Sequence, residues 1–391
     1  MHIAIDAVGI RGHGGAAVLC ELLHWLPKVK PDWTWHVYIF NRNLREFDNP
    51  IVPDNVRIET TNLGNNGFER LKWIQEYLPE KLYLIGADVV FSFANIGNSN
   101  SFVPQVIFCH QPNAFFYDGI PRQAFLKRAR LLFMRNKILQ GAMASEAMIV
   151  QTHAMKNRII QIKPALMDKI HVIPSGYRTL SGKPNIRNEK RNMIDKAQRP
   201  RLIYVSHPSE HKNHIALIRA MPQILKSFPL ASLLLTLEKE NPPNKRYASF
   251  IHNFYNHAKI LGVENNIVWT GILNPDEVSY ALSNCEMSVF PSLAESFGLG
   301  LVESLAAGCP VAGADLRYVH DICGNAAVYF NPNDPNDIAN TIVTTCGNKA
   351  KIENIKLLCK QHSAKYSYRL IAHNIAFVLE NAAKIKTEVG V

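Results

Sequence analysis

Two carboxylates eight residues apart, Glu295 and Glu303, stand on either side of a short glycine-containing turn. The apolar run 287–290 precedes them, so we expect a strand, a turn and the start of a helix. The backbone N–H groups of this turn can point toward one place and bind an anion, above all a phosphate. They belong to Ser296, Phe297, Gly298 and Leu299. On a helix, Glu303 would lie about two turns beyond Glu295, near the same face.

The spacing of the two glutamates is equally compatible with a structural role. Glu295 would then cap the helix, and Glu303 would be a solvated side chain.

The loop that contains Lys212 is a second candidate. It follows a predicted strand at 201–206, includes His207, and leads into a helix from about Ile215. Ligands of doubly wound sheets bind at the carboxyl ends of the strands, so an ammonium group there can meet a diphosphate. The alternative is a solvated loop lysine.

The first half of the chain alternates predicted strands with helices, as a parallel α/β layer does. Two features follow predicted strands: the glycine-rich loop with Gly14 and Gly15, and His110 after the apolar run 105–109. The loop is as compatible with a tight turn as with a binding role. A lone histidine at such a place is more often a hydrogen-bonded structural residue than a functional one.

Composition limits the class of protein. A chain of 391 residues, 47% of them hydrophobic, is long enough for two domains. The first ten residues lack the features of a secretory signal, and no apolar run approaches the roughly 20 residues of a membrane-spanning helix. Seven cysteines without a Cys-x-x-Cys pair are typical of buried thiols in a reducing compartment. We therefore expect a cytoplasmic protein with no structural metal.

The formal charge of +11 indicates acidic partners: nucleic acid, an anionic membrane surface or phosphorylated substrates. The segment Arg122–Lys137 contains six basic residues and no acid, interleaved with apolar side chains. Such a segment can rest on anionic lipid. Its basic residues do not gather on one helical face, so a solvated helix is the alternative.

Several motifs follow one another in the second half. They are Asn266–Gly271, Val289–Ser292, Glu295–Leu299 with Glu303, Gly308–Val311 and Asn325–Pro332. Together they resemble the motifs of the retaining glycosyltransferases of family 4, which have the GT-B fold, and the two glutamates match that family's Glu-x7-Glu signature. Weaker matches at Gly14-Gly15, His110, Ile173–Gly176 and Tyr366–Tyr368 extend the resemblance over most of the chain.

The resemblance implies an α/β fold of two Rossmann-like doubly wound domains facing across a cleft. We expect an acceptor-side domain at 1–178, a linker at 179–200, and a nucleotide-sugar-binding domain at 201–365. The linker is expected because residues 178–201 are polar and basic, with prolines at 184 and 200. Residues 366–391 would form a helix that returns to the first domain.

The resemblance also implies roles for the candidate residues. Glu303 would bind the ribose of the donor, Glu295 its sugar, and the turn 296–299 its diphosphate. Lys212 would neutralise the departing diphosphate without a metal, in agreement with the lack of an Asp-x-Asp motif. His110 would face the reacting sugar, and Gly14 and Gly15 would allow the first domain to approach the phosphates.

The chain departs from the family pattern at Ser206-His207, where many members have Gly-Arg. His207 or His211 would have to substitute for the missing guanidinium.

We therefore predict an enzyme that transfers a sugar from a UDP- or GDP-linked donor to a saccharide or a polyprenyl- or other lipid-linked acceptor. The predicted setting is bacterial surface polysaccharide assembly, lipopolysaccharide included, at the inner face of the membrane, with no cofactor and no nucleic-acid partner. The missing arginine favours an alternative, a catalytically weak binding or scaffold subunit. A third hypothesis, an NAD-dependent enzyme, lacks the Gly-x-Gly-x-x-Gly fingerprint.

Overall fold

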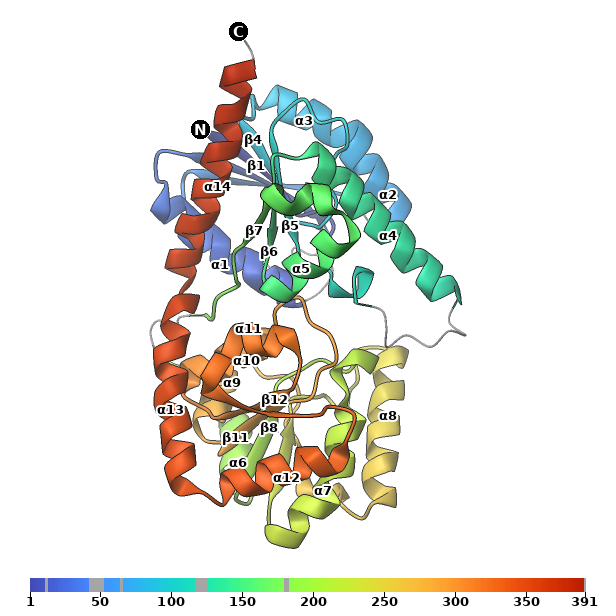
Figure 1. The fold of residues 1–391 in the computed structure, drawn as a ribbon, viewed down its shortest axis with the longest axis vertical. Coiled ribbons are helices and arrows are strands. Elements are labelled where there is room, and N and C mark those ends of the chain that lie inside the picture. Colours follow the sequence, from blue (N-terminus) through green and yellow to red (C-terminus); the bar gives the residue numbers. More distant parts are fainter. Residues whose placement is uncertain (11–12, 42–52, 64–65, 117–124, 179–182, 390–391) are drawn as a thin grey trace. The chain divides into compact units, whose positions relative to one another are not determined.

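The computed structural model describes residues 1–391 except 11–12, 42–52, 64–65, 117–124, 179–182 and 390–391 (Figure 1). The chain folds into two units. The first consists of Met1–Gly176 and Tyr368–Val391, and the second of Tyr177–Ser367. Each unit is an α/β layer with its own parallel sheet, as the alternation of apolar runs and helical segments predicts.

Among its described residues, the first unit has a seven-stranded sheet in the order β3-β2-β1-β4-β5-β6-β7, and every pairing is parallel. The strands are β1 (His2–Asp6), β2 (Thr34–Phe40), β3 (Val56–Thr61), β4 (Val89–Ser92), β5 (Gln105–Cys109), β6 (Ala147–Val150) and β7 (Ile170–Val172). The helices are α1 (His13–Val29), α2 (Gly67–Lys72), α3 (Leu78–Leu84), α4 (Phe125–Ala144), α5 (His153–Ile162) and α14 (Tyr368–Val389), and a π-helical turn at Trp73–Tyr77 joins α2 to α3.

The second unit has a six-stranded parallel sheet in the order β10-β9-β8-β11-β12-β13 within its described residues. The strands are β8 (Arg201–Tyr204), β9 (Ser232–Leu235), β10 (Ile267–Trp269), β11 (Met287–Phe290), β12 (Val311–Ala314) and β13 (Ala327–Phe330). The helices are α6 (Asn188–Lys196), α7 (His214–Ser227), α8 (Lys245–Ile260), α9 (Pro275–Ser283), α10 (Leu299–Ala307), α11 (Arg317–Cys323), α12 (Pro335–Cys346) and α13 (Lys349–Ser363).

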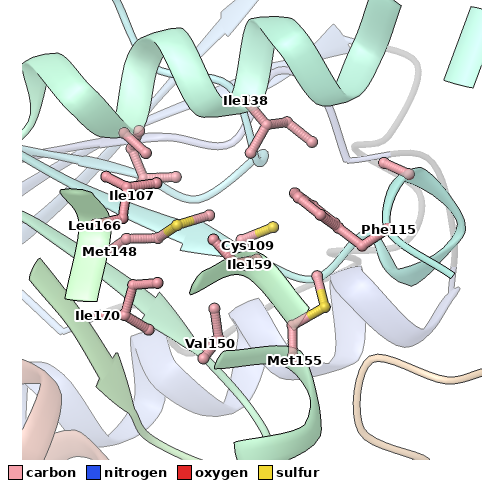
Figure 2. Packing of buried hydrophobic residues seen from close by; sticks show 12 residues of the cluster. Ile107, Cys109, Phe115, Ile138, Met148, Val150, Met155, Ile159, Leu166 and Ile170 are labelled. Carbon is pink, nitrogen blue, oxygen red and sulfur yellow. The ribbon is translucent and has the colours of Figure 1, made fainter. Parts of the chain in front are cut away.

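The central strands β4, β5, β8 and β11 are buried at every position and mostly apolar, as is usual for parallel sheets with helices on both faces. Strands β5 and β6 are fully buried. In Figure 2, side chains of these strands pack with Ile138 of α4 and with Met155 and Ile159 of α5. This packing fixes the carboxyl ends of β5 and β6, and therefore the position of residues such as His110 that follow them.

The final helix joins the first unit, as expected from the resemblance. In α14 the side chains of Ile371, Ile375 and Leu379 are buried. The helix packs beside α1 (Figure 1). Lys30, just beyond α1, forms an ion pair of 2.8 Å with Glu380.

The expected linker at 179–200 is wrong for most of its length. Residues 179–182 lie outside the described residues, but α6 belongs to the second unit, where Ile194 is fully buried in the core. Arg187, just before α6, forms two hydrogen bonds of 2.7 Å with the fully buried carboxylate of Glu277 on α9. The polar composition of this segment suggested a linker because only one face of α6 is buried. The hydrogen bonds between Arg187 and Glu277, which are distant in sequence, hold the helix in place.

One strand was missed, and one local prediction needs correction. Strand β3 was not expected, because Val56–Thr61 is only partly buried and carries charged residues. Helix α1 begins at His13, so Gly14 and Gly15 lie in its first turn rather than in a loop. The preceding residues 11–12 lie outside the described part of the chain.

Candidate functional site

In the second unit the structure brings Lys212 and Glu295 together. Strands β8 and β11 are neighbours in the sheet, and the loops that follow them meet at the carboxyl edge, the side on which the strands end. Lys212 Nζ donates to Glu295 Oε1 at 2.5 Å. The same carboxylate oxygen accepts a hydrogen bond of 2.6 Å from Ser292 Oγ. Both partners are mostly buried, with 17% and 12% of their side chains exposed, so the lysine is held in one place.

The loop around Lys212 is fastened from several sides. The Tyr204 hydroxyl donates to the Lys212 carbonyl at 3.0 Å. Asn213 has the left-handed φ of 56°, and its Nδ2 donates to the carbonyls of Pro291 and Pro332 at 3.3 and 2.7 Å. Leu293 N–H donates to the His211 carbonyl at 2.7 Å. These bonds fix the loop after β8 against those after β11 and β13.

The turn before α10 has the geometry that an anion site needs. Gly298, the N-cap of α10, has φ 95°, a conformation that favours glycine. A Cβ on Gly300 would lie 3.2 Å from the Val205 carbonyl oxygen, so glycine lets the helix start approach the end of β8. In the described part of the chain, the N–H groups of residues 296–300 find no protein acceptor. They are therefore available to bind a phosphate.

Glu303 lies on α10 and is only partly exposed. Burial raises its pKa to about 7, because the ionised carboxylate is poorly solvated there. Within the described residues, no side chain or N–H group forms a hydrogen bond or ion pair with this carboxylate. A carboxylate without a protein partner can accept hydrogen bonds from a pair of ligand hydroxyls.

The expectation that the two glutamates share one helical face is wrong. Helix α10 begins only at Leu299, so Glu295 lies in the loop and Glu303 on the helix. Glu295 does not cap α10 either: the N-cap is Gly298, which has no side chain, and the Glu295 carboxylate accepts hydrogen bonds from Lys212 and Ser292.

The two histidines beside Lys212 differ in their surroundings. His207 is exposed after β8, and its ring meets the edge of Tyr247 of α8 at 5.8 Å between centroids. His211 is half-buried, and its ring lies within hydrogen-bond distance of the Ser209 hydroxyl. The exposed His207 is therefore better placed to contact a ligand.

In the first unit, His110 and Gly15 lie near each other. A Cβ on Gly15 would be 3.8 Å from His110 Nε2, whereas Gly14 is exposed. Burial, together with the nearby cationic Arg70, lowers the pKa of His110 to about 4. The histidine is therefore neutral at pH 7. Its ring can form hydrogen bonds there but does not carry a charge.

Three residues that hold these sites in place were not predicted from the sequence: Ser292, Asn213 and Asn95, whose side chain accepts a hydrogen bond from the His110 N–H. Asn213 and Asn95 are the two non-glycine residues with positive φ in the described part of the chain. Asparagine tolerates this conformation better than most residues, but its sequence signal is weak. Ser292 belongs to the motif Val289–Ser292, but its role depends on where Glu295 lies.

The described residues contain no group of three or more His, Cys, Asp or Glu side chains that could hold a metal ion.

Known proteins with similar sequences match the part of the chain that contains this site. Residues 199–348 match the family model described as glycosyl transferases group 1. The serotype-specific mannosyltransferase WbdA of Escherichia coli is 29% identical over 109 residues, which cover 28% of this chain and 13% of WbdA. The chain therefore spans only a small part of that relative.

Solved structures share the whole fold. The structure of Anabaena HepE in complex with UDP and glucose has a TM-score of 0.69 and 17% identity, and the match covers 97% of this chain and 99% of HepE. WaaG, described as a glycosyltransferase involved in lipopolysaccharide biosynthesis, has a TM-score of 0.70 and 15% identity, with 96% and 99% covered.

The two doubly wound units thus define a GT-B fold. Residues 199–348, most of the second unit, match the group 1 glycosyltransferase domain.

Proposed function

We propose that this protein transfers a sugar, with retention of anomeric configuration, from a UDP- or GDP-linked donor to a saccharide or lipid-linked acceptor. The observation that carries the proposal is the Lys212–Glu295 pair at the carboxyl edge of the second sheet. The loop with Glu295 leads into the start of α10, where backbone N–H groups are available to a diphosphate. One turn further along α10, Glu303 supplies a carboxylate for the ribose hydroxyls.

In this proposal the bond between the anomeric carbon and the phosphate oxygen breaks, and the diphosphate leaves with the electron pair. Lys212 and the amides of 296–300 stabilise the negative charge as it develops, with no metal. The acceptor hydroxyl gives its proton to the departing phosphate oxygen and forms the new bond on the same face of the sugar. Glu295 contacts the donor sugar while it orients Lys212, and His207 helps to hold the diphosphate.

The first unit would bind the acceptor, with His110 beside the reacting sugar and Gly14 and Gly15 at the first turn of α1. The name of WbdA and the description of WaaG support a place in bacterial surface polysaccharide assembly. That reaction would take place in the cytoplasm, where nucleotide sugars and the acceptor meet.

Turnover with a panel of UDP-, GDP- and ADP-linked sugars tests the proposal. We expect release of the nucleoside diphosphate from one donor, and an increase in melting temperature with the same nucleotide, since a ligand that binds only the folded state stabilises it. Nucleotide binding without any turnover would favour the scaffold alternative instead. No binding of any nucleotide would contradict both.

We further propose that α4 rests on an anionic membrane surface. Its first turns expose Phe125 and Leu126, which are 73% and 82% accessible, beside the exposed Lys127 and Arg130. Arg122 lies outside the described residues. No helix in the described ranges has the length and hydropathy to cross a bilayer.

Sedimentation with phosphatidylglycerol vesicles tests this surface. The double variant Lys127→Glu/Arg130→Glu should lose most of its binding, since each basic residue near an anionic surface contributes about 1 kcal/mol. Lys349→Glu/Lys351→Glu, on α13 of the second unit, has the same change in net charge and should bind like the wild type. Equal binding by all three proteins would contradict the assignment of α4.

A further inference from the structure

Asn95 has an unusual backbone conformation at the carboxyl edge of the first sheet. It lies three residues beyond β4 and has φ 73°, in the left-handed region that side chains rarely adopt. Such a conformation costs on the order of 1 kcal/mol and persists only where the surroundings enforce it. Asn95 is only 9% exposed, so contacts inside the fold must hold its left-handed conformation.

The side chain of Asn95 contacts His110 twice. Its Oδ1 accepts a hydrogen bond of 2.6 Å from the backbone N–H of His110. Because a backbone N–H can only donate, this bond fixes which end of the amide is oxygen. The amide nitrogen, Nδ2, then faces His110 Nε2 at 3.4 Å.

This arrangement determines the position of the ring proton. An amide NH₂ group donates and does not accept. His110 Nε2 must therefore be the acceptor, without a hydrogen, and in the neutral ring the proton lies on Nδ1. Nδ1 is buried and has no hydrogen-bond partner in the described part of the structure.

The surroundings of the ring keep it neutral. Phe93 and Phe108 stack on each other at 4.9 Å, and each lies 5.7 Å from the His110 ring. Both the apolar contacts and the cationic Arg70 of α2 disfavour a second proton, which is why the pKa falls to about 4. A buried N–H group without an acceptor is costly, and ligand binding would satisfy it.

We propose that Asn95 is a positioning residue that holds His110 in the neutral Nδ1–H tautomer, so that the histidine donates a hydrogen bond to a substrate oxygen rather than accepting a proton. The substrate part rests on the proposed function, whereas the tautomer does not. The left-handed backbone of Asn95 is what brings its amide to both the N–H and the ring of His110.

The tautomer is measured directly by NMR of ¹⁵N-histidine-labelled protein, with His110→Gln used to assign the signals. We expect the pattern of Nδ1–H for the wild type at pH 7, and a pKa for His110 near 4. An Nε2–H pattern would overturn the proposal whether or not the protein transfers sugar.

Asn95→Asp keeps an oxygen for the backbone N–H but replaces the NH₂ donor with a second oxygen. The proton should then move to Nε2, the pKa of His110 should rise, and turnover should fall about 10²-fold, as for the loss of one oriented donor. Asn98→Asp is the matched control. Asn98 is also buried and lies in the same segment, but its Nδ2 donates to the Ile74 carbonyl and not to the histidine.

A purely structural role would make both aspartate variants lose turnover equally, with the His110 tautomer unchanged, and that result would overturn the proposal. Asn95→Gly tests the same point if Asn95→Asp fails to fold. Glycine adopts the left-handed φ without strain but lacks the amide, so the ring should show a mixture of tautomers and reduced turnover. A pure Nδ1–H pattern in that variant would contradict the role of Asn95.

Discussion

The carboxyl edges of the two sheets present different key residues, although the first strands of the two sheets are arranged alike. In each, the first strand lies in the middle, flanked by the second strand on one side and the fourth on the other. The second edge carries Lys212, Glu295 and Glu303. The first presents a neutral histidine on a pair of aromatic rings. The key group of the second edge is therefore a lysine beside a carboxylate, whereas that of the first is a neutral histidine with the cationic Arg70 nearby.

The difference also shows in how each key residue is held. Lys212 is held by an opposite charge at 2.5 Å, whereas His110 is held by an uncharged amide. In the proposed reaction the Lys212 ammonium stabilises the negative charge that develops on the diphosphate, and the Glu295 carboxylate beside it keeps this ammonium in place. A histidine that only donates a hydrogen bond benefits from a fixed tautomer.

Among these variants, Lys212→Ala should cause the largest loss of turnover, because it removes the lysine at the carboxyl edge of the second sheet. Loss of one preorganised donor to the leaving diphosphate costs about 10²–10³-fold in turnover. The measurement is diphosphate release from the donor found in the panel. Lys226→Ala, an exposed lysine at the end of α7, is the control and should act like the wild type. Turnover by Lys212→Ala near that of the wild type would show that this edge does not carry the chemistry.

Arg187→Ala tests an ion pair of the same unit that serves the fold. It leaves the buried Glu277 carboxylate without its partner; because Arg187 is half exposed, the free energy of unfolding should fall by only about 1–2 kcal/mol at pH 7. Hydrogen bonds from Arg187 lower the pKa of Glu277 from its ordinary value of 4.5 to about 2. The pair therefore stabilises the protein above pH 4.5, and this contribution is lost as the pH falls through 2.

Urea unfolding as a function of pH measures the effect of Arg187→Ala. The difference from the wild type should shrink toward the low pKa of Glu277, near pH 2, and Arg187→Lys should recover part of the loss. A difference that does not depend on pH would mean that the ion pair is not its cause.

Glu303→Gln should weaken nucleotide binding and stabilise the ligand-free protein. Lost hydrogen bonds to the ribose should cost about 10–100-fold in UDP or GDP affinity. Burial raises the pKa of Glu303 from 4.5 to about 7, so in the wild type stability falls as the pH rises from 4.5 to 7. Glutamine removes that loss, and the gain at pH 8 should be about 1–2 kcal/mol, given the partial exposure of the side chain.

Calorimetry and thermal melts at pH 5 and pH 8 separate the two effects of Glu303→Gln. A variant that is less stable than the wild type at pH 8 would show that Glu303 has a structural partner.

His207→Arg should strengthen diphosphate binding at the carboxyl edge of the second sheet by a small amount. A permanent guanidinium would bind the diphosphate more tightly than a histidine, by about 3–10-fold, and this gain should shrink in high salt. Isothermal titration with UDP and GDP measures it, with His207→Gln as the uncharged control. Equal affinity in all three proteins would place His207 away from the diphosphate.

Local patterns in the sequence were enough to predict the class of fold and most of the candidate residues. Apolar runs such as 105–109 and 287–290 identify buried parallel strands, because their periodicity is local. The glycines around Ser296–Leu299 indicate a tight turn before a helix for the same reason. The order of the motifs then indicated the family, and the family implied that the final helix returns to the first unit.

Which side chains are partners depends on the tertiary structure. Lys212 and Glu295 are 83 residues apart and meet because β8 and β11 are neighbours. Asn95 reaches His110 because β4 pairs with β5. Helix α6 is tied to the second unit by the hydrogen bonds from Arg187 to Glu277, 90 residues away. A local pattern fixes the type of element, but a hydrogen bond between distant residues depends on the order and register of the strands.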